Sequence, residues 1–295
     1  MTLDPTTRIL NFKTNKAENL TLEELRLTVD ERSSGGKPVN GIRHVELLDS
    51  IIDRLVKRGI QFSIDTIFAT EGGSGIMNGA TYIQDLAEKY GAMNIRTYIL
   101  RRIIAMIKFH DGDSDHSFGG VAMSYHQQGI MMAYGQSVYV CKNLSIMGTN
   151  NVMTTFGDQY SKLSNIAHMI DVVENWAVNH MDKRMQDLRT MDRMREIEMP
   201  PKAVEEFIGH LNVMRIQKDI YHTIKEYPLN QTQISQFTEN YIREANKNPE
   251  DVMSLYDIYN IGTDFHKAGK TDLPLIIPNN VTFFEALNEK YKLVS

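Results

Sequence analysis

The sequence predicts an α+β protein: an N-terminal antiparallel-sheet domain with a covering helix, then an all-helical C-terminal part containing a long helical hairpin. Two observations carry this prediction. Three β-branched and apolar segments follow one another between residues 95 and 148. From Asp158 to Met199 the chain then has neither glycine nor proline, and its apolar residues recur every three or four positions. We therefore expect a mixed sheet domain over residues 1–157 and a helical domain over residues 158–295.

The first predicted element is a helix over residues 42–58, which Gly59 is placed to end. Its apolar residues, which recur at helical spacing, are Ile42, Val45, Leu48, Ile52, Leu55 and Val56. The alternating segment IQFSIDTIFA predicts a strand after this helix, and TYIQDLAEKYG predicts a short helix. Between them, the glycines of TEGGSGIMNG predict a loop. Its backbone N–H groups could embrace a phosphate, but a connector explains it better, because it matches no nucleotide-binding glycine motif.

Three further strands are expected in succession. They are residues 95–109, the segment FGGVAMSYH and the segment IMMAYGQSVYVCKNLSIMG. Strands that follow one another along the chain usually pair with one another, so we predict an antiparallel meander with helix 42–58 covering one face.

The helical part should begin with a single helix of about 40 residues, roughly 60 Å long, which Pro200 and Pro201 end. A second amphipathic run, Val204 to Ile224, is expected to return antiparallel and complete a hairpin over residues 158–226. Shorter helices follow at 231–246, 249–267 and 282–291. The methionines of MDKRMQDLRTMDRMREIEM form an adaptable stripe that either packs inside the protein or receives a partner, as an oligomerisation arm would.

Composition narrows the class of protein. The chain has 295 residues, 42% of them hydrophobic and 23% charged, and a single cysteine, which excludes a disulfide scaffold and a multi-cysteine zinc module. We expect neither export nor a membrane span, and hence a cytoplasmic protein, since the sequence has no signal-peptide pattern and no long apolar run. The net charge of −5 lacks the basic bulk of a dedicated duplex-DNA binder.

The densest polar group is HDGDSDH, between two predicted strands. His110, Asp111, Asp113 and Asp115 are candidate ligands of a divalent cation, because alternate loop positions can converge on a hard ion. A calcium loop of the helix-loop-helix type is excluded, because its sixth and twelfth positions would be His116 and Ala122. An exposed hairpin loop with aspartate turns is the alternative interpretation, and no other cofactor is expected.

Other catalytic patterns are sparse. Cys141 lies among apolar residues of a predicted strand, where core packing explains it better than a nucleophilic role. Neither G-x-S-x-G nor H-E-x-x-H occurs. The histidines of the long helices, His180 among them, are expected at the helix surface or its boundary. Catalysis thus stays open, with a non-enzymatic role favoured.

The predicted sheet also carries residues suited to nucleic acid. Its basic residues could follow phosphates, while tyrosines such as Tyr125 and Tyr134 could stack bases. The candidate cations are Arg96, Arg101, Arg102 and Lys108. The alternative is that the aromatic rings belong to the core.

Three short motifs carry a family resemblance. A His-Asp-Gly loop stands at His110–Gly112 and a Cys-x-Asn pair at Cys141 and Asn143, and Tyr259, Asn260 and Thr263 continue the pattern. In these motifs the chain resembles, over roughly residues 40–290, a phage- and plasmid-like protein family of unknown function. The resemblance implies a mobile-element protein acting in a bacterial cytoplasm.

Three functions are therefore compatible with the sequence. The first is a non-enzymatic, nucleic-acid-associated accessory protein of phage or plasmid type that binds or anneals single-stranded DNA, as in recombination, and acts as a homo-oligomer. The second is a metal-dependent nuclease or phosphatase that uses the His110–Asp115 loop. The third is a host-directed interaction or inhibitor protein that uses the acidic helical part to bind a host protein.

Overall fold

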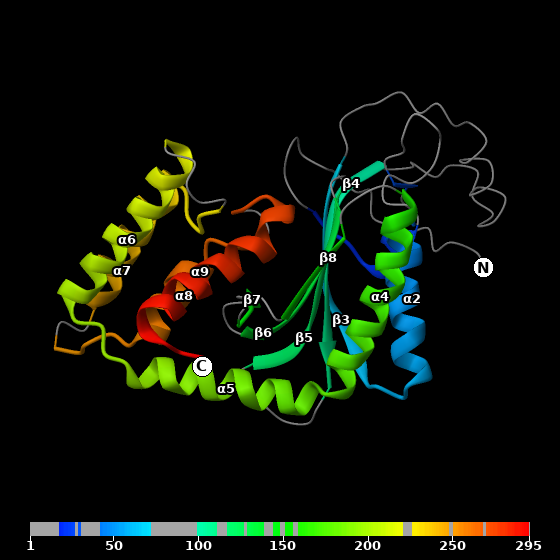
Figure 1. Ribbon diagram of the computed structural model, residues 1–295, viewed down its shortest axis with the longest axis horizontal. Helices are drawn as coiled ribbons and strands as arrows, with labels where there is room; N and C mark the ends of the chain where they lie inside the picture. Colours follow the sequence, from blue (N-terminus) through cyan, green and yellow to red (C-terminus); the bar gives the residue numbers. More distant parts are fainter. Residues whose placement is uncertain are drawn as a thin grey trace. The chain divides into compact units, whose positions relative to one another are not determined.

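A computed structural model confirms the α+β class, with an antiparallel sheet in the N-terminal half and helices in the C-terminal part (Figure 1). It describes residues 18–26, 29–30, 42–71, 99–110, 117–126, 129–138, 144–147, 151–155, 159–220, 226–247, 250–267 and 270–294. The chain divides into two compact units. Unit 1 holds residues 1–110, 121–132 and 153–178, and unit 2 holds residues 111–120, 133–152 and 179–295, so the division differs from a single cut after residue 157.

The sheet follows the predicted meander. Its order is β1-β3-β4-β5-β6-β7, with β2 on β4 and β8 on β6. The strands are β1 (Glu18–Asn19), β2 (Val29–Asp30), β3 (Phe62–Glu71), β4 (Ile99–Phe109), β5 (Ser117–His126), β6 (Gly129–Val138), β7 (Leu144–Ser145) and β8 (Val152–Thr155). The long segment expected as one strand after residue 129 is thus two strands, β6 and β7, which pair antiparallel through Gln136↔Ser145.

The pairing of β3 with β4 gives this part of unit 1 two different faces. Partners directly opposite one another in a ladder share a face, and residues two apart along a strand do so as well. The covered face consists of Phe62, Ile64, Ile67, Ala69, Ile103, Ala105, Ile107 and Phe109. The outer face consists of Ser63, Thr66, Phe68, Thr70, Arg102, Ile104, Met106 and Lys108. A β-bulge between Ile64 and Thr66 places Asp65 between the two alternating sets.

Helix α2 (His44–Lys57) forms where the spacing predicts it, and it lies beside α4 (Gln159–Val178) along one face of β3 and β4 (Figure 1). We assign these helices to the covered face, whose residues are apolar throughout. The buried stripe of α2 contains Leu47 and Ile51 in addition to three predicted positions. Val56, predicted on that stripe, is instead 61% exposed, because the helix turns it to the opposite side.

An ion cluster joins α2 to α4. Arg54 donates to Glu174 at 2.5 Å and to Asp171 at 2.8 Å, and Arg58 also pairs with Glu174. The hydrogen bond from Arg54 holds the pKa of Glu174 below its ordinary value, with Arg58 acting in the same direction. Glu174, near the C-terminal end of α4, therefore connects this helix with Arg54 of α2 and with Arg58, the residue that follows α2.

Replacing Glu174 with glutamine should lower the thermal midpoint of unit 1 and weaken its dependence on salt, because two arginines lose their shared carboxylate. The effect should be modest, since the pair is at the surface. Asp171→Asn is the matched control and should change the midpoint less, because Asp171 pairs with Arg54 alone among the described ion pairs and is 61% exposed. A larger effect for Asp171→Asn would contradict this assignment.

The single helix expected over residues 158–199 is wrong. The structure has two helices, α4 and α5 (His180–Glu196), which meet at Asn179. Asn179 has φ −96° and ψ 20°, outside the helical region. Asparagine is a weak helix former, so a break at this position costs little, but Asn165 and Asn175 stay helical within α4 and apolar spacing alone does not distinguish the three positions.

The short helix α1 (Leu22–Arg26) belongs to unit 1, and the remaining helices of the described residues belong to unit 2. They are α6 (Pro201–Asp219), α7 (Gln231–Ala245), α8 (Leu255–Thr263), the short 3₁₀ helix η2 (Leu273–Leu275) and α9 (Ile276–Tyr291). The hairpin partner of α6 is the following helix, α7, beside which it lies in Figure 1, and α5 packs mainly against α8. No helix of the described residues is long and apolar enough to cross a membrane.

Local chemistry explains two helix starts. The Asn230 side chain accepts from the backbone N–H of Gln233 at 2.9 Å, and the Gln233 side chain accepts from the backbone N–H of Asn230. These two bonds form a capping box that begins α7. Helix α9 begins six residues before the predicted Thr282 and contains Pro278. Proline is tolerated in a first turn, where its missing N–H would have no helical partner.

Aromatic side chains form the centre of unit 2. Phe283 lies 5.9 Å from Phe207, 6.3 Å from Phe237 and 6.1 Å from Tyr259, measured between ring centroids. Methionines of the predicted stripe divide between core and surface: Met191 and Met194 are buried in this core, and Met181 and Met185 are exposed.

Candidate functional site

The outer face of β3 and β4 carries a cation and a hydroxyl at each end. Lys108 stands opposite Ser63, and Arg102 stands opposite Thr70. Lys108 lies six positions after Arg102 along β4, which corresponds to about 20 Å of strand. Each end therefore offers a positive charge and a hydroxyl donor side by side, the combination that phosphate groups accept.

Between these ends the outer face is only partly accessible. Phe68 and Met106 are half-buried, as are Arg102 and Lys108. Ile104, which stands opposite Phe68, is fully buried, and Thr66, opposite Met106, is 8% exposed. An aromatic ring that keeps accessible area between two cations is a place where a base can stack.

Two of the predicted stacking residues are buried. Tyr125 is 4% exposed, and its hydroxyl donates to the backbone oxygen of Ile42 at 2.8 Å, with the ring edge-on to His44. Tyr134 is fully buried. These two rings belong to the interior, as the alternative interpretation held, whereas Phe68, which the sequence reasoning did not single out, is the accessible aromatic residue of the outer face.

The other predicted site residues either lie away from this face or fall outside the residues that the structure describes. Arg101 lies in β4, at a shift in the register with β3. His110 is exposed just after β4, and its N–H donates to the backbone oxygen of Gln61 at 2.9 Å. Arg96, Asp111, Asp113, Asp115, Cys141 and the predicted helix at 81–91 lie outside the described residues. Within the described residues no cluster of three potential metal ligands occurs.

Unit 2 contains a buried polar network that the sequence did not predict. The Tyr134 hydroxyl lies 2.9 Å from Nδ1 of His180 and 3.2 Å from the backbone oxygen of the same residue. His180 is only 5% exposed, so its predicted place at the helix surface is wrong. The reason is the break at Asn179, after which the first turn of α5 directs this imidazole onto β6.

The network continues from β6 to the middle of α5. The Gln136 amide donates to Oδ2 of Asp187 at 3.2 Å and to the Tyr134 hydroxyl at 3.4 Å. Asp187 is 3% exposed, and burial raises its pKa to about 7, although the Gln136 bond and the charge of Lys183 both lower it. A carboxylic acid is thus held close to half-protonated near neutral pH.

Lys183 forms the other branch of the network. Its ammonium donates to Oδ1 of Asn151 at 2.7 Å and lies 5.3 Å above the centre of the Tyr134 ring. Asn151 in turn donates to the backbone oxygen of Met147 at 3.1 Å, which ties together the chain between β7 and β8. Burial lowers the pKa of Lys183, and nearby Asp187 opposes that shift.

Gly119 of β5 explains how the network fits against the sheet. A Cβ atom there would lie 2.5 Å from Cε1 of His180 and 2.9 Å from the Tyr134 hydroxyl. Any side chain at this position would displace the Tyr134–His180 pair. A glycine in a strand signals close approach of another group, and this is the one signal in the sequence that could have indicated the network.

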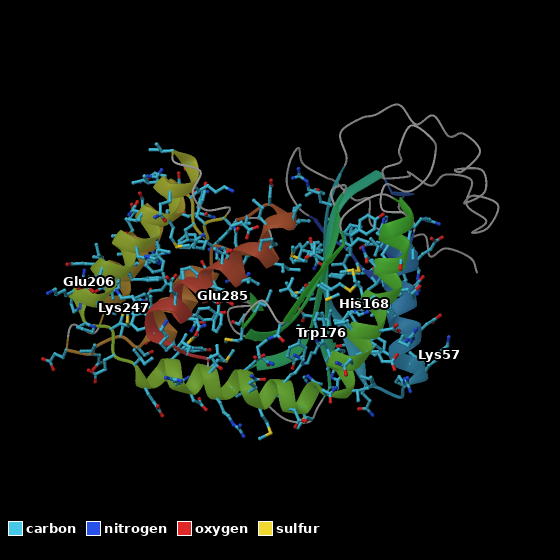
Figure 2. The ribbon with its side chains drawn as sticks, viewed as in Figure 1. Lys57, His168, Trp176, Glu206, Lys247 and Glu285 are labelled. Atoms are coloured by element: carbon cyan, nitrogen blue, oxygen red, sulfur yellow. The ribbon has the colours of Figure 1, made fainter. Side chains whose placement is uncertain are left out.

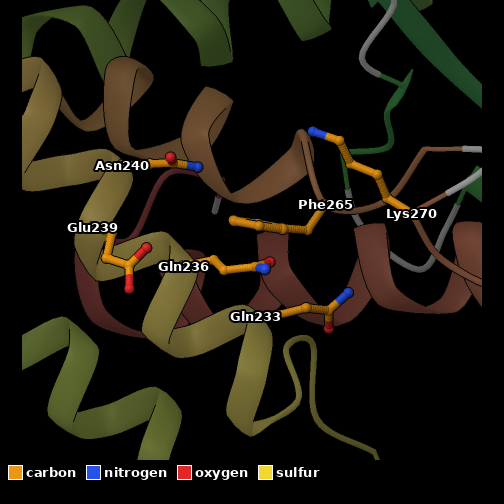
Figure 3. Close-up of a pocket in the computed structure, with 6 residues that line it drawn as sticks. All are labelled: Gln233, Gln236, Glu239, Asn240, Phe265 and Lys270. Carbon is orange, nitrogen blue, oxygen red and sulfur yellow. The ribbon is translucent and has the colours of Figure 1, made fainter.

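Unit 2 also has an open groove of about 440 Å³ over α7 (Figure 3). Its lining residues are Gln233, Gln236, Glu239, Asn240, Phe265 and Lys270. Several of these groups already have partners: Gln233 donates to Thr271, and Lys270 pairs with Asp264. Asn240 accepts from Arg243. The groove is polar and shallow, and none of the predicted site residues lines it.

No family model, no curated protein and no solved structure matches the chain. Function is therefore inferred from the described side chains themselves.

Proposed function

We propose that this protein is a non-enzymatic, nucleic-acid-associated protein that binds single-stranded DNA across the outer face of β3 and β4. One observation carries the proposal: a cation paired with a hydroxyl stands at each end of that face, and Phe68 lies between them. Phosphates would contact Arg102 and Lys108, and a base would stack on Phe68.

Single strands fit this face better than duplex DNA does. The bases of a single strand are free to stack on a side chain, whereas duplex affinity depends on many phosphate contacts. The chain has a net charge of −5, and the outer face contributes two cations. Exposed Asp65 on the neighbouring bulge sets a limit on affinity, because it repels the same phosphates.

We also propose that the protein acts as a homo-oligomer and that it is of phage or plasmid type. A two-cation face gives weak binding per chain, so a homo-oligomer that presents several such faces to one strand would gain affinity through effective concentration. A phage- or plasmid-type protein in a bacterial cytoplasm would meet single-stranded DNA during replication and recombination. The family resemblance in the sequence is compatible with this role.

Replacing both Arg102 and Lys108 with glutamine should weaken binding to labelled oligothymidylate at least about tenfold at low salt, because two phosphate contacts are lost. The slope of log affinity against log salt should fall by about 1.4, since each single-strand contact contributes about 0.7. Fluorescence polarisation across a salt titration measures both quantities, on full-length protein whose assembly state is fixed by light scattering.

The matched control removes two cations elsewhere. Lys202 and Lys218 lie on α6, and their double glutamine variant has the same net charge as the test variant. The control should bind like the wild type. Phe68→Ala should weaken binding without changing the salt slope, and Asp65→Asn should strengthen it. No binding by the wild type at low salt, or equal loss in test and control variants, would refute the proposal.

A further inference from the structure

The Gln136 side chain has one satisfied end and one unsatisfied end. Its nitrogen donates to Asp187 and Tyr134, whereas its oxygen Oε1 is buried without a hydrogen-bond partner in the structure. A buried acceptor without a donor is costly. The Asp187 carboxyl, which the other end of the same amide already contacts, can supply a donor once it carries a proton.

We propose that Asp187 and Gln136 form a proton-operated contact that redistributes the Lys183 ammonium between Asp187 and Asn151. Two arrangements of the same four side chains follow from their hydrogen-bonding capacities. In the ionised arrangement, Asp187 accepts from the Gln136 nitrogen and attracts Lys183, which lies one helical turn earlier on the same face of α5.

In the protonated arrangement the directions reverse. The Asp187 O–H donates to Oε1 of Gln136 after the amide turns by half a rotation, so the acceptor gains a partner while Nε2 gives up its bonds to Asp187 and Tyr134. Neutral Asp187 no longer attracts Lys183, whose ammonium then stays with Asn151 at the observed 2.7 Å. One proton thus decides how firmly Lys183 and Asn151 hold the chain between β7 and β8.

The surroundings allow both arrangements. From α5, Lys183 and Arg184 are the cations on the buried side of the helix near Asp187. From β6 come Tyr134 and Gln136, with His180 reached through Tyr134.

The other described elements add neutral groups. From α8 comes Tyr259, whose pKa is raised by burial and further by the charge of Asp187. From β7 comes the Ser145 hydroxyl. No second carboxylate among the described residues adjoins Asp187, so Asp187 does not share its proton with another carboxylate.

Nuclear magnetic resonance of the full-length protein between pH 5 and 9 tests the contact directly. The Asp187 carboxyl carbon, assigned through its absence in Asp187→Asn, should titrate with a midpoint near 7. The side-chain amides of Gln136 and Asn151 should shift with the same midpoint in the wild type and stay constant in Asp187→Asn. Asp182→Asn, in the exposed first turn of α5, should leave all three titrations unchanged.

A second variant separates the two branches. Lys183→Met should raise the Asp187 midpoint and remove the response of Asn151, while Gln136 still follows the carboxyl. Thermal unfolding gives an independent readout. The melting temperature of the wild type should decrease as the pH rises from 6 to 8, and that of Asp187→Asn should stay constant over this range. The proposal would be overturned by an Asp187 titration midpoint near that of an ordinary aspartate, or by Gln136 and Asn151 amide signals that do not change as Asp187 titrates. Both results can be read from the wild-type spectra, even where a variant fails to fold.

Discussion

Alanine at position 262 will lower the free energy of unfolding of unit 2 by about 2 kcal/mol or more, a cost typical of an overpacked core. Gly262 lies in α8, and a Cβ atom there would stand 2.0 Å from Cζ of Phe283. Both residues are buried, and Phe283 already contacts the rings of Phe207, Phe237, Tyr259 and His266, so its ring has little room to move. The clash outweighs the gain in helix propensity of about 1 kcal/mol that alanine brings.

Gly209 provides the matched control for this substitution. It also lies inside a helix, α6, but a Cβ atom there would meet nothing within 4 Å. Gly209→Ala should therefore stabilise the protein by about 0.5–1 kcal/mol. Urea unfolding measures both variants, and adding Phe283→Leu to Gly262→Ala should recover part of the loss. A neutral Gly262→Ala would show that the aromatic centre repacks freely.

Helix spacing and strand alternation were sufficient to predict the fold class and the order of the long elements. Helix 42–58 and the first two strands after residue 95 have strong periodic patterns and form close to where they are expected, whereas the third predicted strand is divided into β6 and β7. The short strands β1, β2 and β8 were missed, because two to four residues carry no readable alternation and pair only through neighbours far along the chain. The break at Asn179 was missed because apolar spacing continues through it.

The candidate site shows the same limit. Alternation along β4 places Arg102 and Lys108 on one face, but only the register with β3 shows that Ser63 and Thr70 stand beside them. In the network, Gln136, Asn151 and Asp187 come from separate elements, so no local pattern connects them. Burial of Tyr125 and Tyr134 also depends on what packs against the sheet, which a strand pattern does not contain.

Titration of buried histidines should make the two units respond differently to acid. Burial lowers the pKa of His44 in unit 1 to about 3, opposed by a hydrogen bond with the backbone of Leu25. The unfolded chain, with an ordinary histidine pKa near 6.5, therefore binds more protons than the folded unit below that pH. The contribution of neutral His44 to the free energy of unfolding is fully present above about pH 6.5 and decreases as the pH falls. The loss is about 1.4 kcal/mol per pH unit, or about 3 kcal/mol by pH 4.5.

Unit 2 carries two opposing groups over the same range. Burial lowers the pKa of His266 to about 4, so acid destabilises the unit through this residue. Burial raises the pKa of Asp187 to about 7, so the folded unit binds a proton there that the unfolded chain binds only near pH 4, and acid stabilises it. Between pH 6.5 and 4.5 the two residues change the free energy of unfolding in opposite directions and by similar amounts per pH unit, so their effects largely cancel.

We therefore expect unit 1 to unfold before unit 2 on acidification to pH 4.5. Trp176, the one tryptophan of the chain, lies on α4 and is 4% exposed, so its fluorescence reports on unit 1 (Figure 2). Hydrogen exchange followed by mass spectrometry should show protection lost in α2 and α4 while α8 and α9 keep theirs. His44→Asn should reduce the difference between urea unfolding at pH 7 and at pH 4.5, because the titrating group is gone. His168→Asn on the exposed side of α4 is the control, and an equal reduction there, or earlier loss of α8 and α9, would assign the acid response to other groups.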